Sequence, residues 1–311
     1  MENFLPFEKN TGSLKIACVG EAMIELSFAG DNLKQPKIAF AGDTLNSAIY
    51  LKREIKNRAK VSFVTRLGKD EFSRGMLAFM QNEGIDTGHI VLDANKLPGL
   101  YSIMVDEQGE RTFNYWRQNS AARDLFQSGS RIDFSCLSGF DIIYYSAISL
   151  AILPANVRKA FLGWLAEQRS RNNIIVAFDS NYRPALWNGV EEARLWTKMA
   201  WKNCDIALPS ADDEKSLFRD ENPEQTIKRL NGYGAVFGVI KRGGDGPFPL
   251  TPIKDLPNFR PANNVVDTTA AGDSFNGTFL GALLAGTPMK EAMLKAHECA
   301  RKTVGFAGAF K

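Results

Sequence analysis

Short apolar runs alternate with longer amphipathic stretches along most of this 311-residue chain. Each run has the length of a buried strand, and each stretch has the length of a surface helix, which is the pattern of βαβ units around a parallel sheet. The expected strands are 15–19, 61–65, 141–145, 174–178, 206–208 and 236–240. The expected helices are 45–55, 71–83, 156–169, 191–201 and 274–285. The sequence therefore predicts an α/β fold with a mainly parallel sheet.

Two segments interrupt this rhythm, because each holds a pair of strands with no helix between them. The first pair is 24–28 and 37–40, and the second is 100–105 and 111–117. A three-residue loop at 107–109, with Gly109 left-handed, would make the second pair a hairpin with Tyr101 opposite Tyr115. Alternation along the strand then adds Phe113 and Arg117 to the face that carries both tyrosines.

Two interpretations of that face remain open from spacing alone. It can be the solvated side of an edge hairpin, with the tyrosine hydroxyls and the guanidinium in water. It can also be the inner face of a small four-stranded lid that handles a polar, anionic ligand. On the second interpretation the lid consists of 24–40 and 99–118, inserted in a single domain that spans 1–311.

Composition excludes several classes of protein. The formal net charge is only +3, so we expect no nucleic-acid partner, since binding a phosphate backbone requires a concentrated basic face. No secretory signal and no stretch of about 20 apolar residues is present, so we expect no membrane partner. Four dispersed cysteines favour a reducing, cytoplasmic location. With only two histidines, chemistry must depend on carboxylates, backbone dipoles and basic residues.

The stretch 264–277 carries the strongest chemical signal. It reads as a strand at 265–266, a turn of small residues at Ala270, Ala271 and Gly272, and a helix whose first turn holds Asp273. Such a turn lets backbone N–H groups approach an anion, and the helix dipole favours negative charge. A carboxylate there can take a proton from a hydroxyl that attacks phosphorus. The alternative is that Asp273 simply caps the helix.

Other phosphate-binding motifs are incomplete. Gly272 and Gly277 have the glycine spacing of a P-loop, but Thr278 and Phe279 follow where Lys and Ser or Thr are required. Gly20 stands alone after the first strand, so no dinucleotide-binding fingerprint is present.

The string from Asp267 to Phe275, D-T-T-A-A-G-D-S-F, resembles the signature of the ribokinase-like PfkB family of carbohydrate kinases. A second family signature is matched by A-G-D-T-L-N at 41–46, and the resemblance covers nearly the whole chain. Within the family the chain is most similar to 2-keto-3-deoxygluconate kinases, on the strings at 20–26, 97–101, 115–117, 181–184 and 241–243. This resemblance implies a three-layer α/β/α fold with a small β-lid.

The resemblance also implies site residues. Asp273 would be the catalytic base, and Ala270, Ala271 and Gly272 would form the anion hole. The substrate-binding residues implied are Gly42, Asp43, Asn46, Tyr101, Tyr115, Arg117, Arg183 and Asp273. The ATP-binding residues implied are Asn181, Arg183, Lys241, Gly243, Gly246, Ala270 and Gly272.

An arginine is the side chain that best binds a carboxylate, through two parallel hydrogen bonds, so Arg117 and Arg183 suit a sugar acid. The alternative for each is a surface ion pair. ATP and Mg²⁺ are the implied cofactors. The family's N-x-x-E motif, which influences magnesium, is replaced here by Ser210 and Asp213 at the same spacing. An acidic helix start explains Asp213 and Glu214 equally well.

The sequence therefore predicts ATP-dependent phosphorylation of 2-keto-3-deoxygluconate at its primary hydroxyl. Two alternatives stay open: a fructokinase-type or ribokinase-type kinase of the same fold, or a sugar-acid sensor without catalysis. The expected partners are a sugar acid, a nucleotide and a second copy of the chain, since a protruding lid often forms a dimer surface in this family.

Overall fold

The computed structural model describes residues 13–29, 35–105 and 111–311. Its central sheet has five parallel strands in the order β13-β12-β11-β1-β4. These strands are β1 (Leu14–Val19), β4 (Ala59–Val64), β11 (Ile142–Ser146), β12 (Ile175–Asp179) and β13 (Ile206–Leu208). All five lie where the alternation of apolar runs predicts them.

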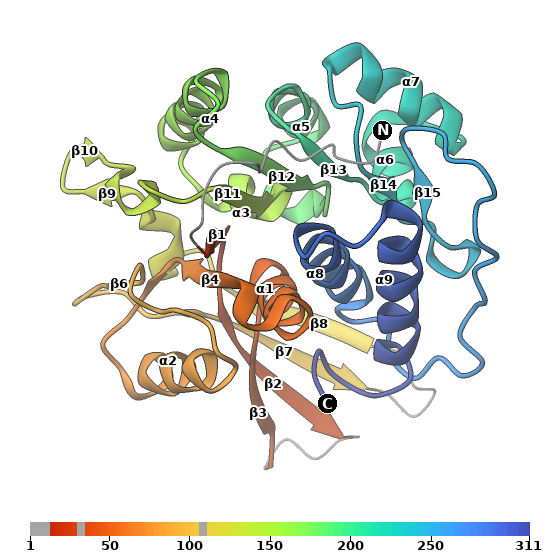
Figure 1. Ribbon diagram of the computed structural model, residues 1–311. Coiled ribbons are helices and arrows are strands. Elements are labelled where there is room, and N and C mark those ends of the chain that lie inside the picture. Colours follow the sequence, from red (N-terminus) through yellow and green to blue (C-terminus); the bar gives the residue numbers. More distant parts are fainter. Residues whose placement is uncertain (1–12, 30–34, 106–110) are drawn as a thin grey trace.

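Helices cover both faces of this sheet, so the predicted three-layer architecture is confirmed (Figure 1). One face carries α1 (Asp43–Ile55), α2 (Glu71–Asn82), α8 (Ala271–Leu284) and α9 (Met289–Thr303). The other carries α3 (Ala147–Ile152), α4 (Ala155–Ser170), α5 (Val190–Lys202), α6 (Ala211–Phe218) and α7 (Pro223–Tyr233). Along β1, the side chain of Ile16 packs against the helices on the first of these faces, and that of Ala17 packs against the helices on the other. A strand buried on both sides must be continuously apolar, which is why the sequence pattern locates these strands.

Short elements complete the connections. The two-residue strands are β5 (Arg66–Leu67), β6 (Val91–Leu92), β9 (Gln127–Ser128), β10 (Arg131–Ile132), β14 (Val239–Ile240) and β15 (Phe248–Pro249). The 3₁₀ turns are η1 (Lys56–Arg58), η2 (Ala121–Asp124), η3 (Ser135–Leu137), η4 (Pro184–Leu186) and η5 (Gly243–Asp245). No helix in the described ranges is both long and apolar enough to cross a bilayer.

Two expected strands differ from the structure. The run 236–240 shortens to β14, which pairs antiparallel with β15 and meets the parallel sheet through a bridge between Gly238 and Ala207. The strand expected at 265–266 is absent, and both valine side chains are about half exposed. The amide of Val266 instead donates to the carbonyl of Val304 at 2.7 Å. The end of α9 thus supplies the hydrogen-bond acceptor that a neighbouring strand would otherwise provide.

A second sheet of four strands, in the order β3-β2-β7-β8, forms the lid (Figure 1). Its strands are β2 (Met23–Ala29), β3 (Lys37–Ala41), β7 (Gly99–Val105) and β8 (Arg111–Trp116). Tyr101 pairs with Tyr115 and Ile103 with Phe113, as the hairpin register predicts. The turn expected at 107–109, with Gly109, lies outside the described residues.

The strand order reverses beside β1, since the chain passes from β1 to β4 on one side and later to β11 on the other. Ligands of open α/β sheets bind at such a reversal, beyond the carboxyl ends of the strands. Ser146 ends β11 and Asp179 ends β12, so both polar side chains lie at this edge.

Helices α1 and α8 pack unusually closely, because Gly277 presents no side chain to α1. A Cβ on Gly277 would lie 2.2 Å from the carbonyl oxygen of Ser47 and 2.7 Å from the Cβ of Tyr50. Both contacts are with parts of α1 that cannot rotate away. This contact therefore fixes the separation of the two helices that start at the edge of the sheet.

We expect Gly277→Ala to destabilise the protein, because the added methyl must push α1 and α8 apart. Overpacking of this kind costs about 1–3 kcal/mol in the free energy of unfolding. Gly163→Ala in α4 is the matched control, since a Cβ there meets nothing within 4 Å, and it should stabilise by roughly 0.4–1 kcal/mol. Urea unfolding of the two variants measures both effects, and equal midpoints would contradict the close contact.

Candidate active site

The turn of small residues expected at 270–272 is shorter in the structure, because Ala271 and Gly272 already belong to α8. Ala270 is the N-cap residue and adopts a left-handed conformation at φ 59°. The amides of Gly272 and Asp273 lie in the first turn, and neither donates to any residue that the structure describes. Free amides at a helix N-terminus favour a negatively charged group.

Asp273 does not cap this helix, so the alternative interpretation of it is wrong. Its Oδ2 atom instead accepts a hydrogen bond of 2.8 Å from Nδ2 of Asn46 in α1. Burial raises the pKa of Asp273 to about 8, with further raising by Asp43 and Asp179. The hydrogen bond from Asn46 and the charge of Lys241 act in the opposite direction. A carboxylate with a pKa in this range is suited to act as a general base near neutral pH.

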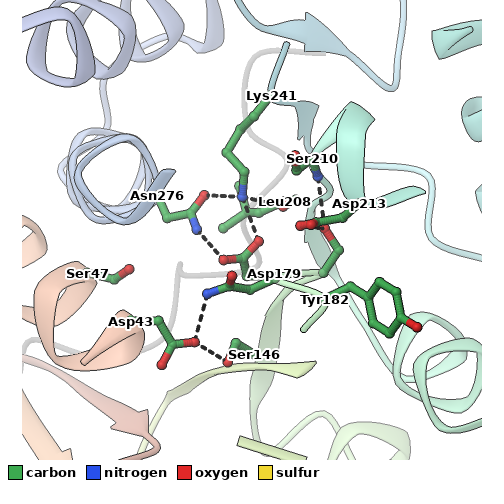
Figure 2. Close-up of polar contacts among 12 residues, drawn as sticks. Asp43, Ser47, Ser146, Asp179, Tyr182, Leu208, Ser210, Asp213, Lys241 and Asn276 are labelled. Atoms are coloured by element: carbon green, nitrogen blue, oxygen red, sulfur yellow. Dashed lines mark hydrogen bonds and ion pairs between the residues drawn. The ribbon is translucent and has the colours of Figure 1, made fainter. Parts of the chain in front are cut away.

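Lys241 neutralises part of this carboxylate cluster from within (Figure 2). Its Nζ atom donates to Oδ1 of Asp179 at 2.6 Å, to the carbonyl of Leu208 at 2.7 Å and to Oδ1 of Asn276 at 3.0 Å. Asn276 also donates to Oδ2 of Asp179 at 2.9 Å. An ammonium has three N–H donors, and all three are engaged here. Lys241 thus ties β12, β13 and α8 together beside the anion site.

Asp43 opens α1 on the side opposite Lys241 (Figure 2). It accepts hydrogen bonds from Oγ of Ser146 and, at 3.0 Å, from Nδ2 of Asn181. Burial raises the pKa of Asp43, and the nearby Asp179 raises it further. Gly42 permits this placement, since a Cβ there would lie 2.2 Å from the carbonyl oxygen of Glu21.

The inner face of the lid is the row of Glu25, Tyr101 and Tyr115, and it is not simply solvated. Tyr101 is 6% exposed and donates its hydroxyl hydrogen bond to Glu25. Burial and Glu25, with a smaller effect of Asp273, raise the pKa of Tyr101, so this ring lies within the electrostatic range of Asp273. Tyr115 stacks on Tyr101 with ring centroids 5.7 Å apart and remains 46% exposed. The interpretation as a wet edge hairpin is therefore wrong for Tyr101.

Arg117 follows β8 and forms a buried ion pair with Glu21, which follows β1. The surface ion pair considered from sequence is thus wrong for this residue. Oε1 of Glu21 and Nε of Arg117 have no hydrogen-bond partner among the described residues. Buried polar atoms left free in this way need a partner, which a bound ligand or an ordered water can supply.

Arg183, unlike the buried Arg117, has a side chain that is 56% exposed. Nη1 of Arg183 is 3.7 Å from Oδ1 of Asp213, so the surface ion pair describes its present state. Burial and Asp179 raise the pKa of Asp213, which accepts a hydrogen bond from Ser180 at 3.2 Å. Glu214 is unrelated to this edge. It is buried against Arg229, and burial raises its pKa to about 7.

The loop after Lys241 provides the remaining predicted nucleotide residues. Gly243 is the first residue of η5 and Gly246 follows its last residue, and both have positive φ angles. Gly246 packs directly against Phe259, which lines a cavity of about 320 Å³ together with Arg260 and His297. No cluster of three or more metal-ligating side chains occurs in the described part of the chain.

The structure brings together most of the residues predicted from sequence, and it adds others. Asn46, Asp43 and Asp273 form one connected group, and Asn181 joins them through Asp43. The residues missed are Glu21, Glu25, Ser146, Asp179 and Asn276. A usable signal existed for Asn276, because a polar residue three positions after Asp273 shares its helix face. Glu21 and Glu25 also stand out as charges within an apolar segment.

Comparison with known proteins identifies the family of this chain. Residues 13–310 match the family described as pfkB family carbohydrate kinase. The chain is 41% identical to a 2-dehydro-3-deoxygluconokinase of Dickeya dadantii, over 94% of this chain and 96% of that protein. It is 39% identical to a 2-dehydro-3-deoxygluconokinase of Escherichia coli K12, over 96% and 97% of the two chains.

A solved structure has the same architecture over nearly its whole length. The crystal structure of a PfkB protein from Polaromonas sp. JS666 superposes with a TM-score of 0.78 at 27% identity, over 93% of this chain and 95% of that one. The family match over residues 13–310 and the shared fold together show that the chain belongs to the PfkB family of carbohydrate kinases.

Proposed function

We propose that this kinase transfers the γ-phosphoryl group of ATP to the 6-hydroxyl of 2-keto-3-deoxygluconate, giving 2-keto-3-deoxy-6-phosphogluconate. The observation that carries the proposal is the placement of Asp273, a partly buried carboxylate beside free amides at the start of α8. The names of the similar proteins, 2-dehydro-3-deoxygluconokinases, support this sugar acid as the acceptor.

In this reaction Asp273 takes the proton of the primary hydroxyl as its oxygen attacks the γ-phosphorus. A new O–P bond forms while the bond from the γ-phosphorus to the β,γ-bridging oxygen breaks, and ADP leaves with that electron pair. The backbone at Ala270, Ala271 and Gly272 surrounds the transferring group, and its free amide at Gly272 stabilises charge that grows in the transition state, since the amide of Ala271 already donates to Thr268. Asn46 keeps the Asp273 carboxylate oriented toward the acceptor.

The sugar acid lies between the lid and α1 in this proposal. Arg117 and Arg183 receive its carboxylate, while Tyr101 and Tyr115 cover its carbon chain. Because Glu21 already compensates the charge of Arg117 in a buried pair, we assign Arg117 the role of an oriented donor. Arg183, which is exposed and only loosely paired with Asp213 at 3.7 Å, supplies the more available positive charge. The hydroxyls are received by the polar groups at the start of α1, namely Gly42, Asp43 and Asn46.

The nucleotide lies on the opposite side, along the loop that follows β14. We propose that Gly243 and Gly246 border its ribose and phosphates and that the cavity beside Phe259 receives its base. Lys241 and Asn181 support this side, and Arg183 lies between the two substrates. Mg²⁺ would supply charge neutralisation to the phosphates, and Asp213 offers the hard carboxylate oxygen that Mg²⁺ prefers.

A substrate panel tests the proposed function. We expect ADP release from MgATP with 2-keto-3-deoxygluconate, and none above background with fructose, ribose or adenosine, because those acceptors lack a carboxylate for the arginines. The galacto epimer of the sugar acid belongs in the same panel. Turnover confined to a neutral sugar would contradict the assignment of the acceptor, and silence across the panel would favour a sensor.

The pH dependence tests the base. We expect kcat/KM for the sugar acid to rise with pH to a plateau above about 8, as the raised pKa of Asp273 requires its proton to be lost first. Asp43→Asn removes a negative charge that raises the pKa of Asp273, so the rise should move to lower pH. An unchanged profile would contradict the coupling of the two carboxylates.

Asp273→Asn is the control for this experiment. Turnover should fall by about 10³-fold, the usual contribution of a general base.

The same variant also tests how the raised pKa affects stability. The native state holds the Asp273 proton up to a pH of about 8, whereas the unfolded chain loses it near its ordinary pKa. Wild-type stability therefore decreases as pH rises through that interval. The variant lacks this loss, so its melting temperature should exceed that of the wild type more at pH 8 than at pH 5.

We also propose that the enzyme is a dimer formed through the outer face of the lid. That face exposes Trp116 and Ile38 by more than half beside a hollow of about 470 Å³. The hollow is lined by Leu26, Phe28, Leu100, Ser102, Met104, Asn114 and Trp116. A large apolar projection next to an apolar hollow on one surface is what a two-fold, self-complementary interface requires.

Light scattering coupled to gel filtration measures this directly. We expect a dimer mass for the wild type and a monomer mass for Trp116→Lys, since a buried lysine at the centre of the interface has no partner. Leu195→Lys in α5 is the matched control, because Leu195 is similarly exposed on a distant helix, and it should remain dimeric. A monomeric wild type would overturn the proposal.

A further inference from the structure

Strand β8 of the lid is anchored at both of its ends by arginine–carboxylate pairs. Arg117, immediately after the strand, pairs with Glu21 at the end of β1. Arg111, the first residue of the strand, pairs with Asp267. A strand of six residues spans roughly 20 Å, so the two pairs hold the lid at widely separated points. Arg117 lies on the part of the lid that the proposed function assigns to the sugar acid. Arg111, at the other end of the strand, is given no role by that proposal.

Arg111 reaches the segment that leads directly into the anion site. Its Nη1 atom pairs with Oδ1 of Asp267 and also donates to Oγ1 of Thr269 at 3.3 Å. Thr269 precedes Ala270, the left-handed residue that caps α8. The arginine thus contacts two of the residues that shape the turn carrying the phosphoryl-binding amides.

Asp267 itself connects three parts of the chain. Oδ1 accepts from the amide of Thr269 at 2.8 Å, and Oδ2 accepts from the amide of Gly308 at 2.7 Å. The side chain of Asp267 is only 2% exposed and that of Arg111 is 20% exposed. Burial opposes ionisation, but the hydrogen bonds from Thr269 and Gly308 and the charge of Arg111 together lower the pKa of Asp267. The carboxylate is therefore charged at neutral pH, and losing its cation would leave a buried charge without a counter-ion.

We infer that Arg111 is a positioning residue for phosphoryl transfer: through Asp267 and Thr269 it fixes the spacing between the lid and the anion-binding turn at the start of α8. The lid holds the sugar and the turn holds the transferring group, so this spacing sets the alignment of the acceptor oxygen with the phosphorus. For its effect on turnover, the inference rests on the proposed function. Misplacement of reacting groups by about 1 Å can cost on the order of 100-fold in rate.

The test compares Arg111→Met with Arg111→Lys and with Arg169→Met. Arg169 forms a pair of similar kind with Asp205, at 2.6 Å, between α4 and the start of β13, far from the lid. Hydrogen–deuterium exchange of the ligand-free proteins is measured first. We expect Arg111→Met to speed exchange in both 111–116 and 266–274, and Arg169→Met to leave both segments unchanged.

Steady-state kinetics provide the second readout. Arg111→Met should lower kcat by about 100-fold with a smaller change in the KM for ATP, and Arg111→Lys should recover part of the loss because it restores the charge. A double-mutant cycle with Asp267→Asn should be strongly non-additive, since both changes break one contact.

The outcomes separate this inference from the proposed function. If Arg111→Met only lowers the melting temperature, as Arg169→Met does, with exchange at 266–274 and kcat unchanged, the positioning role is refuted. If the wild type fails to phosphorylate the sugar acid, the proposed function fails, and exchange at 266–274 still decides whether Arg111 holds the turn. Should Arg111→Met fail to fold, Arg111→Lys provides the same exchange and kinetic comparison.

Discussion

The crowding of carboxylates at the carboxyl edge of the sheet is the constraint on which the site depends. Asp43, Asp179, Asp213 and Asp273 come from four different segments, and Asp179 raises the pKa of each of the other three. Lys241 opposes this effect from the middle of the group, held by a carboxylate, a carbonyl and an amide. Like charges placed together are costly, and groups with shifted pKa values cluster at functional sites. In the proposed mechanism, this balance of charges gives the base, Asp273, a pKa of about 8, so that it can both lose and regain a proton near neutral pH.

Sequence patterns located the parallel strands and the helix that begins at Ala271, because double-sided burial and small residues before an apolar helix leave local signals. They failed at 265–266, where two β-branched residues suggest a strand but no neighbouring strand is available to pair with them. Hairpin geometry alone fixes the register of Tyr101 against Tyr115, so that was predictable. The hydrogen-bond and ion-pair partners of those side chains could not be predicted from the sequence.

The unpredicted contacts share one property: their partners are distant in sequence. Lys241 meets Asp179 across 62 positions, and Arg117 meets Glu21 across 96. Such pairs arise only after the sheet has assembled, so no local rule predicts them. In the proposed function these contacts prepare the lid for its ligand. Because Glu25 holds the Tyr101 hydroxyl and Glu21 holds Arg117, both side chains are oriented before the sugar acid binds, which reduces the ordering cost of binding.

The close packing of α1 against α8, permitted by Gly277, has a consequence for how such enzymes diversify. In the proposed mechanism, the base Asp273 and the amide of Asn46 that orients it lie on two closely packed helices of the main body, whereas the strands of the lid cover the acceptor. On that mechanism, substitutions in β2 or β7, or in β8 away from Arg111, can change which molecule is accepted without disturbing the proton transfer. The scaffold is in this sense modular, because the helices carry the groups that react and the lid strands carry the groups that select the acceptor.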